Sequence, residues 1–62
     1  MSIITVRSVG EMYAAINNVD ETIIYKNTHD AALDAMCKVL VITEYPIDIA
    51  CDGVDSIYTF KD

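Results

Sequence analysis

Polar and apolar residues follow different periods along the chain, and each change of period marks the boundary of an expected element. Residues 2–7 are rich in Ile, Val and Thr, which is typical of a β-strand. Residues 21–26 contain a second short run of the same kind. Between these two runs, apolar residues recur at the spacing of one helical face: Val9, Met12, Tyr13 and Ile16. The pattern therefore predicts a strand, a short helix and a second strand.

The expected first helix has a start signal and a stop signal. Ser8 and Glu11 have the spacing of a capping box, in which each side chain bonds a backbone amide at the other position. Gly10 weakens this first turn, because glycine has low helix propensity. Residues 17–18, two asparagines, would end the helix.

A second helix is expected after residue 26, with Asn27 or Thr28 as its N-cap. Asp30 in the first turn suits the positive end of the helix dipole. Asp34 and Lys38 are four residues apart, which favours an ion pair. The sequence leaves two positions for the end of the helix. Residues 39–43 are β-branched enough to form a strand, in which case the helix ends near Lys38; otherwise it continues beyond Lys38. Its apolar stripe consists of Leu33, Met36, Cys37 and Leu40.

The last third of the chain predicts a β-hairpin. Pro46 breaks the preceding element, and Asp52–Gly53 is a preferred two-residue turn. If these two residues form the loop, Cys51 lies opposite Val54, and the apolar and polar side chains separate onto two faces. The expected apolar face carries Ile47, Ile49, Cys51, Val54, Tyr58 and Phe60, and the polar face Asp48, Ala50, Asp55, Ile57, Thr59 and Lys61.

The elements together predict a single α+β domain over residues 1–62, in the order β-α-β-α-β-β. We expect a mostly antiparallel sheet with both helices on one face, in two layers. Such a sheet has edge strands, which can pair with another chain.

Composition adds that this domain cannot bury all its apolar residues. A chain of this length buries only about 60% of its unfolded surface, so its interior is small. Apolar residues make up 53% of the chain, which is more than one such interior can hold. Exposed apolar residues that gather in a patch mark an interaction surface. The four tyrosines, at positions 13, 25, 45 and 58, either belong to such a patch or rim a small core.

The charge balance restricts the partners. The chain has ten acidic and four basic residues, a net charge of −6. So few cations disfavour direct binding to nucleic acid or to an anionic membrane, and the charge favours a protein partner with a basic surface. The N-terminus lacks the pattern of a signal peptide, and apolar runs such as residues 39–42 are too short to span a membrane. Two cysteines in so small a domain indicate free thiols in a reducing cytoplasm.

The chain has few residues of the types and spacings that catalysis, metal binding or cofactor binding requires. His29 is the single histidine, and its place in a first helical turn predicts an exposed structural role. Cys37 and Cys51 lack the close pairing of zinc ligands and are expected to be buried thiols. Asp48 and Asp52 lack the ligand pattern of a calcium loop. The chain is therefore not expected to be an enzyme or to hold a cofactor or metal.

The leading hypothesis is a small acidic regulatory protein that binds and inhibits or modulates another protein. Antitoxins and the anti-host or anti-defence inhibitors of phages and mobile elements are proteins of this kind, and the target could be a nucleic-acid-handling protein. The alternative is a self-associating homodimeric structural or assembly module, which would bury the surplus apolar surface. The expected partner-binding residues are Tyr45, Asp48, Asp52, Asp55 and Tyr58.

Overall fold

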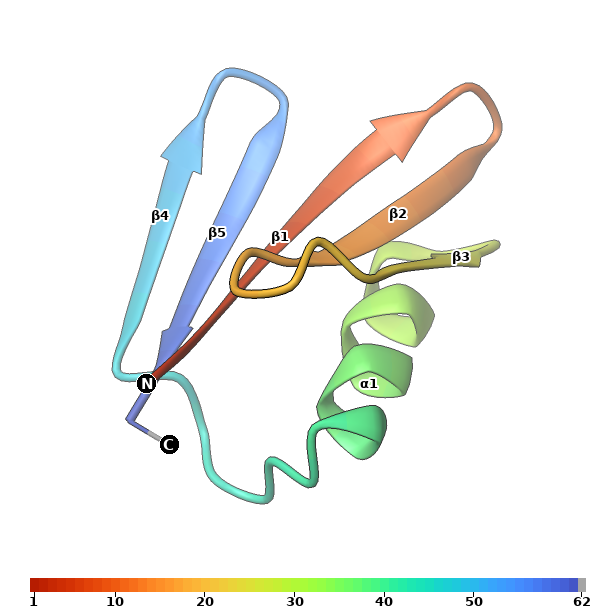
Figure 1. Cartoon of the computed structure of the whole chain (residues 1–62). Helices are drawn as coiled ribbons and strands as arrows, with labels where there is room; N and C mark the ends of the chain where they lie inside the picture. The colour runs from red at the N-terminus through yellow and green to blue at the C-terminus, as the bar shows by residue number, and fades with distance from the viewer. Residues whose placement is uncertain (62) are drawn as a thin grey trace.

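In the part of the chain that the structure describes, five antiparallel strands form one sheet in the order β3-β2-β1-β5-β4, and a single helix packs on one side of it (Figure 1). The structure is a computed structural model and describes residues 1–61. The start of β1 lies beside the end of β5, because these two strands are antiparallel neighbours. The elements are β1 (Ser2–Val9), β2 (Met12–Asn17), β3 (Ile23–Lys26), α1 (His29–Val39), β4 (Asp48–Asp52) and β5 (Asp55–Phe60).

The predicted order β-α-β-α-β-β with two helices is wrong, because the segment expected to form the first helix is strand β2. Val9 pairs with Met12, so Gly10 and Glu11 form a two-residue hairpin loop instead of the first turn of a helix. Gly10 has a φ of 63°, a conformation that glycine adopts without steric cost. Ser8 belongs to β1, and the capping box does not form. The domain is thus mostly β with one helix.

The second predicted helix is confirmed as α1. The Thr28 side chain accepts a hydrogen bond from the amide of Ala31 at 3.1 Å, as expected of an N-cap. Lys38 Nζ lies 3.0 Å from the carboxylate of Asp34. Of the two predicted ends, the earlier one is confirmed, since α1 ends at Val39 and residues 39–43 form no strand.

The core lies mainly between α1 and the three strands β1, β2 and β3, and β5 adds Phe60 to it. β1 is the central strand, paired with β2 on one side and β5 on the other, and its Ile4 and Val6 face the helix. Met36 on α1 is fully buried against them, which stabilises the fold by about 1.5–3 kcal/mol. The buried cluster consists of Ile4, Val6, Ala15, Ala32, Met36 and Phe60.

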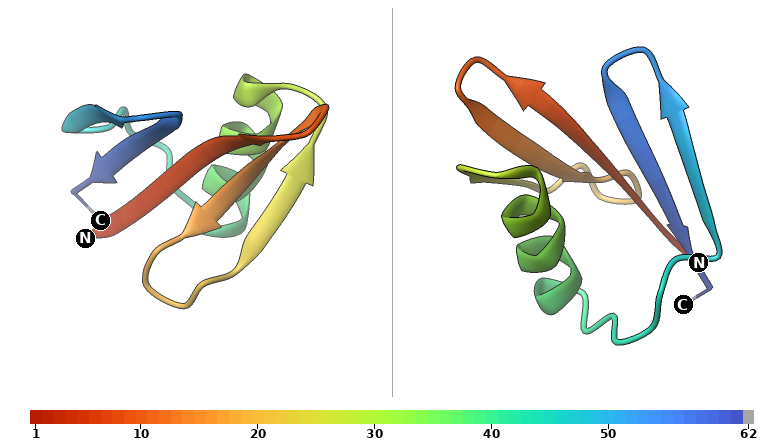
Figure 2. Two further views of the ribbon diagram at one scale, coloured as in Figure 1. Left: turned by 90° about the horizontal axis from the view of Figure 1, so that it is seen from above. Right: turned by 180° about the vertical axis from the view of Figure 1, so that it is seen from behind.

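The predicted C-terminal hairpin is present, but its turn lies one residue later than expected. Asp52 pairs with Asp55, so the loop is Gly53–Val54, and Cys51 lies opposite Ser56. Only the first loop residue has a positive φ, 63° at Gly53, which is the pattern of a type II′ turn. Because the pairing moved by two residues, the side chains within β4 and β5 keep their predicted faces, whereas Val54 lies in the loop and Ile47 and Lys61 lie outside the strands. The hairpin extends away from α1, which lies over β1, β2 and β3 (Figure 2).

Candidate protein-binding surfaces

The side of the sheet that faces away from α1 has no element packed on it, in the part of the chain that the structure describes. We call it the open face. Since side chains alternate along a strand, it carries the neighbours of Ile4 and Val6, which point to the helix. Apolar residues dominate it. Its members are Ile3, Thr5, Arg7, Val9, Met12, Ala14, Ile16, Ile23, Tyr25, Asp48, Ala50, Asp52, Asp55, Ile57 and Thr59.

A transverse row of small and apolar side chains crosses the open face from one edge of the sheet to the other. The strand registers place Ile23 beside Ile16, Ile16 beside Thr5, Thr5 beside Ile57, and Ile57 beside Ala50. Thr5, in the middle, is only 6% exposed although no element covers it, because its larger neighbours shield it. At the end of the row, Ile23 is 46% exposed. This apolar row makes the open face unusually suited to contact with another molecule.

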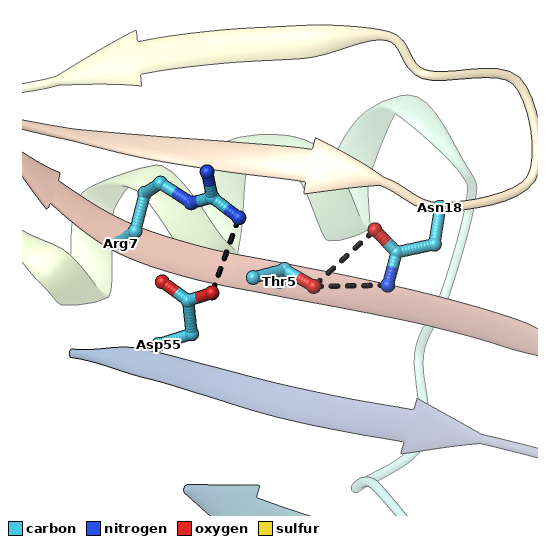
Figure 3. Close-up of polar contacts among 4 residues, drawn as sticks. All are labelled: Thr5, Arg7, Asn18 and Asp55. Atoms are coloured by element: carbon cyan, nitrogen blue, oxygen red, sulfur yellow. Dashed lines mark hydrogen bonds and ion pairs between the residues drawn. The ribbon is translucent and has the colours of Figure 1, made fainter. Parts of the chain in front are cut away.

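The polar groups at the middle of the open face already have partners within the chain (Figure 3). Asn18 Nδ2 donates to Thr5 Oγ1 at 2.9 Å, and the Arg7 guanidinium donates to the Asp55 carboxylate at 3.1 Å. Among the described residues, no buried side-chain nitrogen or oxygen lacks a partner. Another molecule could therefore cover this face without leaving these groups unpaired.

A hollow of about 410 Å³ opens on the other side of the sheet, between α1, residues 42–46 and the end of β5. Three carboxylates line it, those of Asp30, Asp34 and Glu44. Lys38 neutralises Asp34 at 3.0 Å, so the other two give the hollow a negative rim. The apolar part of the lining consists of Leu33, Cys37, Ile42, Tyr45, Pro46 and Phe60. We call this feature the acidic hollow.

His29 is half-buried, so the prediction that it is exposed is wrong. Its Nε2 lies 3.2 Å from the hydroxyl of Tyr58, and its ring meets that of Tyr13 edge-on, with ring centres 5.9 Å apart. Burial raises the pKa of Tyr58, and the negative charge of Asp30 raises it further. Both tyrosines lie on strands, so His29 ties the first turn of α1 to β2 and β5.

The two free thiols lie in different environments. Burial raises the pKa of Cys37, and the charge of Asp34 adds to this. A thiol held in its protonated form is a poor nucleophile and a poor metal ligand. Cys37 is half-buried and Cys51 on β4 is exposed, so the prediction that both thiols are buried is wrong. Within residues 1–61, no group of three or more His, Cys, Asp or Glu side chains could hold a metal ion.

The five predicted partner-binding residues do not share one surface. Tyr45 is 94% exposed at the acidic hollow, and Tyr58 is half-buried on the same side of the sheet. Asp48, Asp52 and Asp55 lie on the open face, and the last of them pairs with Arg7. The residues thus divide between two surfaces on opposite sides of the sheet.

Sequence reasoning missed the open face, although the chain carries a signal for it. Residues 12–16 are apolar at odd and even positions alike, which is typical of a strand that buries both faces. The same run also fits a helix, and the helical interpretation concealed the second apolar face.

Comparisons with known proteins found no significant match. No family model matches the chain, and neither a curated protein nor a solved structure is significantly similar to it. None of the helical segments within residues 1–61 has the length and apolar character needed to cross a membrane. The two surfaces described above are therefore the basis of any functional argument.

Proposed function

We propose that this protein is a non-catalytic binding module that attaches to a basic segment of another protein and modulates that protein. The observation that carries the proposal is the acidic hollow, which joins an apolar lining to the carboxylates of Asp30 and Glu44; among the described residues, the only basic group within ion-pair distance of them is the His29 ring, whose Nδ1 lies 3.6 Å from Asp30. Apolar concavities with a few charged groups at their edge are the usual form of a site that holds an anchoring side chain.

The charges of the hollow define the chemistry of the partner. Asp30 and Glu44 line it without a lysine or arginine ion pair among the described residues, and the whole chain has a net charge of −6. A negative site on a negative protein attracts cationic segments over a distance and repels anionic ones. The segment that fits has an aliphatic or aromatic anchor with lysine or arginine on either side of it.

Tyr45 supports this assignment from the edge of the hollow. Its side chain is almost fully exposed, and both Tyr45 and Glu44 line the hollow. The exposed ring can pack on the anchor of the partner or on a cationic side chain.

The titratable groups near the hollow favour binding over catalysis. The raised pKa of the Cys37 thiol keeps it protonated at neutral pH. The His29 ring is engaged by Tyr58 and Tyr13. Neither group is placed as an activated nucleophile or a free base.

The test is an NMR titration of the ¹⁵N-labelled protein with three short probe peptides. The first alternates leucine with lysine, the second leucine with glutamate, and the third alanine with lysine. We expect saturable shifts with the first peptide alone, centred on Leu33, Cys37 and Ile42. No saturable shift, or shifts centred on the open face, would contradict the proposal.

Two charge-reversal variants separate the effect of the hollow on peptide binding from the effect of the protein's net charge. Glu44→Lys should weaken binding of the leucine–lysine peptide at least tenfold. Glu11→Lys makes the same change of charge in the exposed loop between β1 and β2 and should weaken binding much less. Equal effects of the two variants would show that the peptide responds only to the overall charge.

A further inference from the structure

We propose that two copies of this chain associate through their open faces, forming a symmetric sandwich of two sheets. This proposal goes beyond the binding of a basic segment, since it concerns the opposite side of the sheet and a different occupant. Sheets that pack face to face keep their strand directions within about 30° of each other, at a separation of about 10 Å.

The apolar row supplies the centre of this interface. It runs from Ile23 on one edge strand to Ala50 on the other, across every strand of the sheet. Tyr25, Val9 and Met12 extend it, and all three are exposed. Interfaces between identical subunits have more apolar centres than ordinary protein surface has.

The charges of the open face fit a second copy. The one cation on this face, Arg7, is already paired with Asp55, so the middle of the face is neutral. Asp48 and Asp52 lie on the edge strand β4, at the rim. A neutral apolar centre with a charged rim allows two acidic chains to meet without burying like charges.

The size of the face is near what a reversible dimer needs. Five strands at a spacing of about 4.8 Å, with up to eight residues at about 3.3 Å each, give on the order of 500–600 Å² per copy. Weak and transient complexes bury less than about 600 Å² per partner, and stable ones about 800 Å². The expected dimer is therefore reversible, with a dissociation constant in the micromolar range.

Pairing of two copies along their β4 edges is the competing arrangement, and the sequence of β4 opposes it. Antiparallel pairing of two β4 strands centred on Ala50 would place Asp48 of each copy opposite Asp52 of the other. Like charges directly opposite each other destabilise a strand pair, and charged edge strands are a known device against such pairing.

The sandwich has a consequence for the acidic hollow. Because α1 and the hollow lie on the other side of the sheet from the open face, a dimer would present two hollows on its two outer sides. A partner with two basic segments could then engage both, and the second contact would be intramolecular.

The test is sedimentation equilibrium of the wild-type protein and two matched variants. Ile23→Glu puts a charge at the end of the apolar row, and Ile49→Glu makes the same change on the helix-facing side of β4, where Ile49 is 60% exposed. We expect a wild-type dimer at about 100 μM, consistent with a micromolar constant. Ile23→Glu should raise the dissociation constant at least tenfold and Ile49→Glu less than threefold.

A wild-type protein that sediments as a monomer at this concentration would overturn the proposal, whatever the variants do. A larger effect of Ile49→Glu than of Ile23→Glu would overturn it as well. Circular dichroism confirms that each variant is folded, and Tyr25→Glu replaces Ile23→Glu if that variant unfolds. Glu44→Lys should leave the dimer intact, so failure of the hollow and failure of the dimer are distinguishable.

Discussion

The two hairpins of this protein have similar loops but different environments. Both β1–β2 and β4–β5 are joined by two-residue loops that begin with glycine at a φ of 63°. The β1–β2 hairpin lies under α1 and holds most of the buried residues. In the β4–β5 hairpin, every residue of β4 is exposed, and only β5 reaches the core, through Phe60 and Tyr58.

This difference shows that the formation of a hairpin and the burial of its residues have separate causes. Turn chemistry is local, and it produces a hairpin wherever glycine and strand-forming residues meet. Burial depends on what lies above the hairpin, and α1 is long enough to cover only three of the five strands. The covered half stabilises the fold, which leaves the exposed hairpin and the open face available for contact with other molecules.

The largest expected effect contrasts a covered residue with an exposed one. Met36→Ala removes the fully buried side chain at the centre of the core and should lower the free energy of unfolding by about 2–5 kcal/mol. Ile49→Ala in the exposed hairpin should change it by less than about 0.5 kcal/mol. Urea denaturation at one fixed protein concentration measures both values. Similar losses in the two variants would show that β4 is packed as tightly as the core.

A smaller effect compares the two loops. Gly10→Ala and Gly53→Ala meet no atom within 4 Å, so each costs only the strain of a positive φ, about 1–2 kcal/mol. At Gly10 the loss should appear in the global free energy of unfolding, because β1–β2 holds the core. At Gly53 it should appear mainly as faster amide exchange in β4, which can detach locally. The same exchange pattern in both variants would contradict this division.

The smallest effect is a loss of stability in base. The pKa values of Cys37 and Tyr58 are raised by burial, so the folded state favours their protonated forms. Their contribution to the free energy of unfolding is fully present below the ordinary thiol pKa of 9.0. It is lost as the pH rises through the pKa values of the two groups in the folded state. Denaturation is measured at about pH 8 and at about pH 11. Between these two pH values, the free energy of unfolding should fall less in the Cys37→Ser/Tyr58→Phe variant than in the wild type.

Cys51→Ser is the matched control for removal of a thiol, because Cys51 is exposed on β4. The charge of Cys51 is the weakest of the causes that raise the pKa of Tyr58, so this variant should lose nearly as much stability at high pH as the wild type does. A double variant that behaves like this control would show that neither buried group contributes.

The predictable parts of the fold were those with a local cause. The helix from His29 to Val39 follows from Thr28, Asp30 and its apolar stripe, and the C-terminal hairpin follows from its glycine turn. The first hairpin was missed because residues 8–11 match a capping box as well as a turn. The choice between them depends on pairing with β3, which follows after a short loop, and with β5, which lies far away in the sequence.

The apolar character of the candidate surfaces could be predicted from the sequence, but their positions could not. The surplus of apolar residues correctly indicated exposed apolar surface, and twelve large hydrophobic residues are exposed within residues 1–61, among them Tyr45 and Ile23. Their positions could not be predicted, because the sequence does not show that one helix covers one face of the sheet. Placing Tyr45 and the hairpin carboxylates on opposite sides required the strand registers.

We propose that a second copy of the chain covers the open face in solution. An isotope-filtered NOE experiment tests this on a mixture of labelled and unlabelled protein, at a concentration at which the dimer predominates. We expect intermolecular contacts from the side chains of Met12, Ile16 and Ile23. Intermolecular contacts confined to β4, or none at all, would contradict the proposal.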